Sequence, residues 1–278
     1  MGFDSPPPKC IYGCILAVGI YTMVIPSKMY GHHVANLREL EFALSHTERL
    51  ARSAISSRDP QKSLRSLLRL YAFLIGAWAE CRLRKLLHEP SGFHVAERKQ
   101  LIEKHTQLEQ WQETVDVAFR KHHCIPKAPL NASVLGVTHA ARREALHDVL
   151  QKELRDIIEI RNKLAHGQWI YPFNEDGTVV LAEKYRAINK ENLLSLEFKY
   201  ALIRHLAEAV HDLVVSNETF ERDFDARFRR LLQVRTNLKT RSYDKYAQSL
   251  VERRKNARIA KTSSNEQFAA VGKSLSSS

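Results

Sequence analysis

The sequence has few cysteines. Four occur in 278 residues, and no two of them form a CxxC pair: Cys10, Cys14, Cys81 and Cys124. A disulfide framework is therefore not expected. The chain also has no internal repeat, no P-loop and no GxGxxG motif. The usual sequence signatures of repeat proteins and of nucleotide-binding enzymes are thus missing.

Metal-ligating residue types gather at one place, KHHC at residues 121–124. Neighbouring side chains on a helix point about 100° apart, and no second ligand pair follows at zinc-finger spacing. We therefore interpret His122 and His123 as exposed polar residues, and we expect neither a metal nor another cofactor.

Positive charge is concentrated near the C-terminus. The formal net charge is +12, and residues 226–261 hold twelve Lys or Arg against two acidic residues. Such an excess predicts a polyanionic partner, either nucleic acid or an anionic membrane surface. We expect a basic helical extension at 217–262 and a disordered tail at 263–278. The candidate RNA-binding residues are Lys163, Arg229, Arg230, Arg253, Arg254 and Lys255.

The extension allows a second interpretation. Apolar side chains recur along it at helical spacing, which favours packing on the body of the protein: Phe220, Phe224, Phe228 and Leu231. In that case its charges are only a solvated helix face.

The N-terminal segment, residues 1–28, includes an uncharged stretch at 10–27. It is at the short limit for a membrane helix, which needs about 17–25 residues, and Pro26 weakens it further. Three interpretations remain: a true start at Met29, a membrane anchor, or a secretory signal. The first predicts a cytoplasmic protein and the second a membrane-anchored one.

The rest of the pattern predicts an all-α protein, a bundle of about five helices in a domain at 29–216. Apolar residues recur at helical spacing in five segments: 33–57, 60–88, 93–123, about 139–166, and 189–215 with Asn189 as N-cap. The second segment is apolar nearly all round, which is typical of a core helix. After the fourth, QWIYPF and TVVLAEKYRAI flank the turn sequence NEDG. They predict a small β-hairpin at about 168–187.

The fourth helix ends in EIRNKLAHGQW, residues 159–169. Gly167 can serve as its left-handed cap. Arg161 falls on the face that carries the apolar stripe of Leu150, Leu154, Ile157 and Leu164. Burying a guanidinium on such a face costs free energy unless the group is paired with an acid or remains hydrated. Either an ion pair with Glu153 or Asp156, or a polar cleft, explains it.

A second Arg–His pair offers an internal comparison. Arg142 and His147 have the same five-residue spacing, but no small polar residue follows the arginine and no glycine follows the histidine. This pair also lies in the middle of a helix. We therefore expect it to have no part in the chemistry.

The string RNKLAHG resembles the motif of the HEPN superfamily: arginine, a polar residue, three more residues, then histidine. The resemblance covers roughly residues 30–216. It implies a HEPN-like helical bundle, with Arg161 and His166 as the catalytic pair and Asn162 as a polar helper. One subgroup, partnered with a nucleotidyltransferase antitoxin, has a tyrosine two residues after the histidine. Gln168 stands there in this chain, so that partnership is not implied.

The activity that the resemblance implies is metal-independent endoribonuclease cleavage, in which the 2′-hydroxyl attacks the adjacent phosphate. Histidine exchanges protons near neutral pH, and arginine stabilises charge on the phosphate. One protomer supplies one residue of each kind, so a homodimer with facing motifs is implied. RNA is the expected partner, with an antitoxin or phage-defence partner by analogy. The alternatives are a non-catalytic HEPN module that binds RNA or protein, and a membrane-tethered adaptor.

Overall fold

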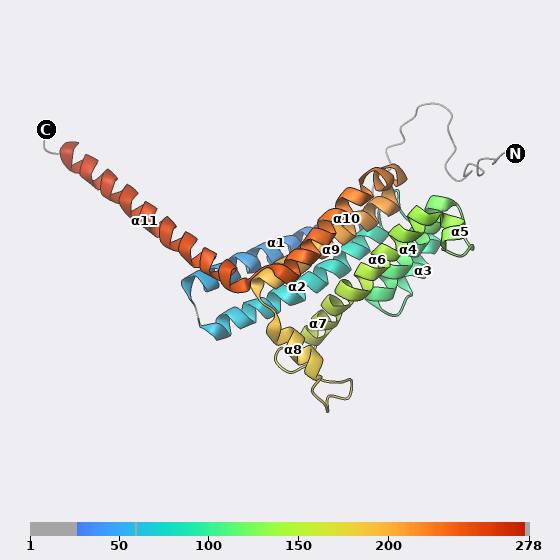
Figure 1. The fold of residues 1–278 in the computed structure, drawn as a ribbon, viewed down its shortest axis with the longest axis horizontal. Helices are drawn as coiled ribbons and strands as arrows, with labels where there is room; N and C mark the ends of the chain where they lie inside the picture. Colours follow the sequence, from blue (N-terminus) through green and yellow to red (C-terminus); the bar gives the residue numbers. More distant parts are fainter. Residues whose placement is uncertain (1–26, 59, 276–278) are drawn as a thin grey trace. The chain divides into compact units, whose positions relative to one another are not determined.

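The computed structural model describes residues 27–58 and 60–275, with side chains as far as residue 260. The regular elements of this part are helices (Figure 1), so the all-α class is confirmed. In chain order they are α1 (Lys28–Ser57), α2 (Gln61–Leu87), α3 (Val95–Ile102), α4 (Gln107–His123), α5 (Ala132–Leu135), α6 (Val137–Val149), the π-helical segment η2 (Leu150–Leu154), α7 (Arg155–Ala165), α8 (Ala182–Lys190), α9 (Leu193–Val215), α10 (Asn217–Thr240) and α11 (Tyr243–Leu275).

The chain divides into two compact units, each assembled from three stretches of sequence. Unit 1 contains the described residues up to Glu39, then Gly76–Glu159 and Leu202–Leu232. Unit 2 contains Leu40–Ile75, Ile160–Ala201 and the residues from Gln233 onward. Each unit therefore includes residues of the expected domain at 29–216 and residues of the C-terminal extension.

The core of unit 1 includes the first half of the extension. Its buried side chains come from α2, α4, α6, α9 and α10, and include Trp78, Leu87, Trp111, Phe119, Leu146, Leu206, Val210, Phe220, Phe224 and Leu231. Burying each large apolar side chain contributes roughly 1.5–3 kcal/mol. The interpretation that this part of the extension packs on the body is thus confirmed for Phe220, Phe224 and Leu231.

The core of unit 2 is formed from α1, α2, α7, α8 and α9. Its buried side chains include Leu44, Ala51, Tyr71, Ile75, Leu164, Ile188, Leu193 and Leu196. The start of α11 is attached to the same unit, because Tyr246 Oη donates to Glu197 Oε1 at 2.6 Å and Arg254 Nη1 donates to Ser53 O at 3.2 Å. The helix continues to Leu275, so residues 263–275 are helical where the sequence predicts disorder.

Two helix boundaries differ from those predicted. The segment expected as one helix at 93–123 is two helices, because Thr106 begins α4 with a capping box: its hydroxyl accepts from Glu109 N at 3.1 Å, and Glu109 accepts from Thr106 N at 3.0 Å. The expected N-cap Asn189 lies inside α8. Asn192 caps α9 instead, accepting from Ser195 N at 2.9 Å.

The predicted β-hairpin is wrong. The described residues of this region contain a single β-bridge, Phe173 with Val180, and α8 occupies most of the expected second strand. The loop is closed locally, because Asn174 Oδ1 accepts hydrogen bonds from Thr178 N at 2.9 Å and Val179 N at 3.0 Å. The segment AEKYRAINK then follows as a helix, and no second strand forms.

No helix in the described part of the chain is both long and apolar enough to cross a membrane. The uncharged stretch at 10–27, on which the anchor and signal interpretations depend, lies outside the described residues apart from its last position.

Candidate functional site

The motif RNKLAHG ends helix α7 as the sequence predicts. Gly167 adopts a left-handed backbone with φ of 75°, and the helix closes with two bonds: Gln168 N to Lys163 O at 3.0 Å and Gly167 N to Leu164 O at 3.1 Å. This pair is the Schellman arrangement of a helix C-terminus. His166 is therefore the last residue before the chain turns away, and its side chain is exposed.

Arg161 is half-buried on α7, and burial lowers the pKa of its guanidinium. An arginine so placed still carries its charge at neutral pH. Its Nη1 donates a hydrogen bond to Asn162 Oδ1 at 3.0 Å, so the side chains of these two neighbouring residues are bonded to each other. Asn162 and His166 are joined by a main-chain hydrogen bond, in which His166 N donates to Asn162 O at 3.1 Å.

A π-helical segment precedes the motif helix. In Leu150–Leu154 the bonds run over five residues, as from Arg155 N to Leu150 O, and the extra residue rotates the following side chains relative to a regular α-helix. The stripe Leu150, Leu154, Ile157 and Leu164 is buried as predicted, and so are Ile158 and Ile160. Spacing alone did not indicate this shift, because the apolar pattern is also consistent with an uninterrupted helix.

The loop after the motif is attached to the helix by neighbouring side chains. Lys163 Nζ donates to Phe173 O at 2.6 Å, and Gln168 Oε1 accepts from Phe173 N at 2.8 Å. The buried Arg69 of α2 donates to Trp169 O at 3.1 Å and to Asn189 Oδ1 at 2.9 Å, and it also bonds Ile188 O. Lys163, a candidate RNA-binding residue, therefore has a local structural role.

This loop and α8 expose an apolar surface, here called the post-motif surface. It consists of Trp169, Ile170, Tyr171, Val179, Val180 and Tyr185. Tyr171 and Tyr185 stack with their ring planes 6° apart and their centroids 5.5 Å apart. Six exposed large apolar residues within seventeen positions are unusual for a surface in contact only with water, and such a grouping is typical of an interaction site.

The comparison pair Arg142 and His147 is placed differently. Arg142 Nη1 lies 2.8 Å from Glu221 Oε2, and His147 Nε2 lies 2.7 Å from Asp116 Oδ1. Arg143 also binds Asp116, at 2.7 Å. Burial by itself raises the pKa of Asp116, but the hydrogen bonds from His147 and Arg143 hold that pKa below its usual value. These residues are thus engaged in ion pairs within unit 1.

The basic residues of the extension have unlike environments. Arg229, Arg230, Arg253 and Lys255 are exposed. Arg254 instead closes the end of α1, since its Nη1 donates to Ser53 O and Ser56 Oγ at 3.2 Å and also bonds Ser57. The charges available to an RNA phosphate are therefore fewer than the sequence count implies.

The expectation that His122 and His123 diverge is wrong. Their ring centroids are 4.9 Å apart, and the structure brings His139 to within 5.0 Å and 4.7 Å of them. The sequence contained no signal for this meeting, because fifteen residues, among them the short helix α5, lie between His123 and His139.

Comparisons of this chain with protein families, with curated proteins and with solved structures find no match.

Proposed function

We propose that this protein is a metal-independent endoribonuclease of the HEPN type, acting as a toxin or phage-defence effector, with Arg161, Asn162 and His166 as its catalytic residues. The observation that carries the proposal is the contrast between the histidines of its two Arg–His pairs. His166 is exposed at the end of α7, whereas His147 Nε2 lies 2.7 Å from Asp116 Oδ1.

The proposed reaction needs no external reactant. The 2′-oxygen of the RNA bonds to phosphorus as the bond from phosphorus to the 5′-oxygen breaks. One histidine takes the 2′ proton and another group gives a proton to the departing 5′-oxygen, leaving a 2′,3′-cyclic phosphate and a 5′-hydroxyl. Proton transfers of this kind contribute about 10²–10⁴-fold each. Arg161, positioned by its bond to Asn162, supplies donors to the charged phosphate.

A second protomer supplies the missing proton donor in this proposal. Residues five apart on an α-helix point about 140° away from each other, so helix geometry alone does not direct Arg161 and His166 of one chain to the same atom. The post-motif surface supports dimerisation, because it follows the motif directly and exposes six large apolar side chains. In this proposal the post-motif surface of one protomer packs against the same surface of a second protomer.

The test is cleavage of mixed RNA by purified protein in excess chelator, with wild type beside His166→Ala. Cleavage by the wild type alone supports the proposal. If wild type and variant both bind RNA but neither cuts it, the protein is a non-catalytic RNA-binding module.

A further inference from the structure

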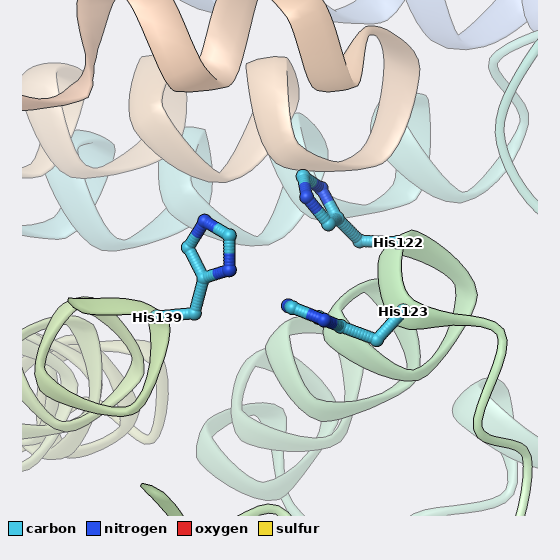
Figure 2. A group of neighbouring side chains, drawn as sticks. All are labelled: His122, His123 and His139. Atoms are coloured by element: carbon cyan, nitrogen blue, oxygen red, sulfur yellow. The ribbon is translucent and has the colours of Figure 1, made fainter. Parts of the chain in front are cut away.

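Three histidines from two helices meet in unit 1. His122 and His123 form the end of α4, and His139 lies in the first turn of α6. Figure 2 shows the three rings turned toward one another. One ring nitrogen of each residue lies within 4.8 Å of those of the other two.

The backbone at both helix ends sets this meeting. Cys124 adopts a left-handed conformation with φ of 57° and ends α4 immediately after His123, with Ile125 N bonded to Arg120 O at 3.0 Å. Gly136, with φ of 77°, begins α6, and its carbonyl accepts from Ala140 N at 3.1 Å. The site is therefore defined by two helix termini and does not depend on a long loop.

Two buried aromatic rings border the cluster on one side. The buried ring of Phe119 lies with its centroid 6.5 Å from that of His139, and the buried ring of Phe220 lies 6.1 Å from that of His122. Phe119 and Phe220 pack edge to face at 5.8 Å. These contacts restrict the rotamers of the histidines, which is a requirement of a preorganised site.

One nitrogen of the cluster, His123 Nε2, is buried without a hydrogen-bond partner among the described residues. A buried imidazole nitrogen without a partner is costly, and it calls for a specific explanation such as an ion. The neighbouring His122 side chain, by contrast, has Asn217 as a hydrogen-bonding neighbour.

The other contacts of the cluster are those of an outer shell. Glu221 Oε1 lies 3.2 Å from His122 Nε2 and 2.6 Å from His139 Nε2. Arg142 Nη1 holds the other carboxylate oxygen at 2.8 Å. A histidine that binds a metal through one nitrogen commonly donates its other N–H to a carboxylate. Glu221 fits that role for two of the three histidines.

We propose that His122, His123 and His139 bind one zinc ion, with Glu221 orienting His122 and His139 from the outer shell and water in the fourth position. Zn–N bonds of about 2.0–2.1 Å put tetrahedral nitrogens about 3.3 Å apart, so the ring nitrogens, which lie within 4.8 Å of one another, approach each other on binding. Imidazole ligands favour zinc and its neighbours over calcium and magnesium, which prefer oxygen. The ion joins the end of α4 to the start of α6.

The test uses the full-length protein without a polyhistidine tag, stripped with chelator and dialysed. Zinc is added in competition with a chromophoric chelator, and the melting temperature is measured in parallel. We expect one zinc per chain and a rise in melting temperature. We expect His123→Ala to bind at least about 100-fold more weakly, since loss of an outer-shell partner already costs about 10–100-fold. His123→Cys restores a ligand and should recover stoichiometric binding.

The matched control is His105→Ala, which removes an exposed histidine between α3 and α4 and should leave zinc affinity unchanged. Glu221→Gln should weaken binding by about 10–100-fold. A wild-type chain that binds no stoichiometric zinc overturns the proposal, whatever the variants do. Equal affinities in His123→Ala and His105→Ala overturn it as well. If His123→Ala does not fold, cobalt substitution of the wild type decides the question, because a nitrogen-ligated tetrahedral site gives intense visible bands and aqueous cobalt does not.

Discussion

His147 Nε2 lies 2.7 Å from Asp116 Oδ1, and this contact fixes the imidazole of the second Arg–His pair in an ion-pair network. The side chain of His166 in the motif is instead exposed at the end of α7. Two pairs with the same sequence spacing therefore have different surroundings, and this difference can be tested by substitution.

The first prediction concerns these two pairs. His166→Ala should lower the cleavage rate by about 10²–10⁴-fold and Arg161→Ala by about 10²–10³-fold, with little change in melting temperature. His147→Ala and Arg142→Ala should leave the specific activity of the folded protein unchanged. They should instead lower the free energy of unfolding by about 1–3 kcal/mol, because each removes one of the partners of a carboxylate, Glu221 or Asp116. Loss of activity in the second pair with retention in the first would show that the catalytic residues are misassigned.

The second prediction concerns the post-motif surface. A double variant, Ile170→Asp with Tyr171→Asp, should convert the protein to a monomer and abolish cleavage, since charges on both copies repel and are desolvated. Val95→Asp, on an exposed apolar residue of α3, should leave both properties unchanged. Analytical ultracentrifugation at the assay concentration measures the change. A variant that is monomeric and fully active would contradict the composite site.

The third prediction concerns pH and the buried Glu89. Burial alone raises the pKa of this carboxyl, but bonds from His211, at 3.2 Å, and Lys85 lower it to about 2. Because this pKa lies below the unfolded value of 4.5, the unfolded chain binds the proton first. The stabilisation is therefore complete above about pH 4.5 and is lost as the pH falls toward 2.

Glu89→Gln should remove about 2 kcal/mol of unfolding free energy at pH 7, a figure discounted for solvent screening. It should also flatten the dependence of stability on pH between 4.5 and 2, as measured by urea unfolding. Glu103→Gln is the control, because its ion pair with Lys99 is exposed and is worth less than about 1 kcal/mol. If the unfolding free energy of Glu89→Gln still falls between pH 4.5 and 2 as steeply as that of the wild type, another group governs this loss of stability.

The fourth prediction concerns the basic extension. A triple variant of exposed residues, Arg230→Gln, Arg253→Gln and Lys255→Gln, should bind single-stranded RNA more weakly. Its log–log salt slope should be shallower by up to about 2, since each phosphate contact contributes about 0.7. Arg254→Gln is the control: it should lower the melting temperature by releasing the end of α1 and leave the slope unchanged. An unchanged slope in a folded triple variant would reject RNA binding by the extension.

Truncation near Ser216 does not give the same information. It removes Phe220, Phe224 and Leu231 from the core of unit 1, and losing a buried phenylalanine costs about 3–5 kcal/mol. We therefore expect the truncated protein to unfold, and the charge variants are the usable test.

Much of the fold could be predicted from local pattern. The apolar stripe of α7 and the αL cap at Gly167 are properties of neighbouring residues, and both were predicted correctly. The capping box of Thr106 and Glu109 is also a local signal, since it follows the pattern TxxE. The sequence predicts a strand where α8 forms, because Val179 and Val180 precede this segment and Tyr185 lies in it, whereas Asn174 closes the loop within a few residues.

The remaining features depend on tertiary arrangement. The π segment Leu150–Leu154 is compatible with the same apolar spacing as an α-helix. Arg69 reaches the loop after the motif from about one hundred positions upstream. His139 approaches His122 and His123 only because two helix ends meet. No spacing rule within one segment predicts the contacts of Arg69 and His139, because each joins residues that are distant in sequence.

The measurement that tests the proposed function most directly is the end chemistry of RNA cut in excess EDTA, with wild type and His166→Ala compared on the same RNA and circular dichroism confirming that both stay folded. Folding is checked because chelation also removes the zinc proposed for unit 1, which should lower the melting temperature and leave the RNA chemistry intact. We expect the wild type to produce 2′,3′-cyclic phosphates and 5′-hydroxyls and the variant to produce neither. Cleavage that stops in EDTA while the protein remains folded, and resumes with magnesium, would contradict the proposed function.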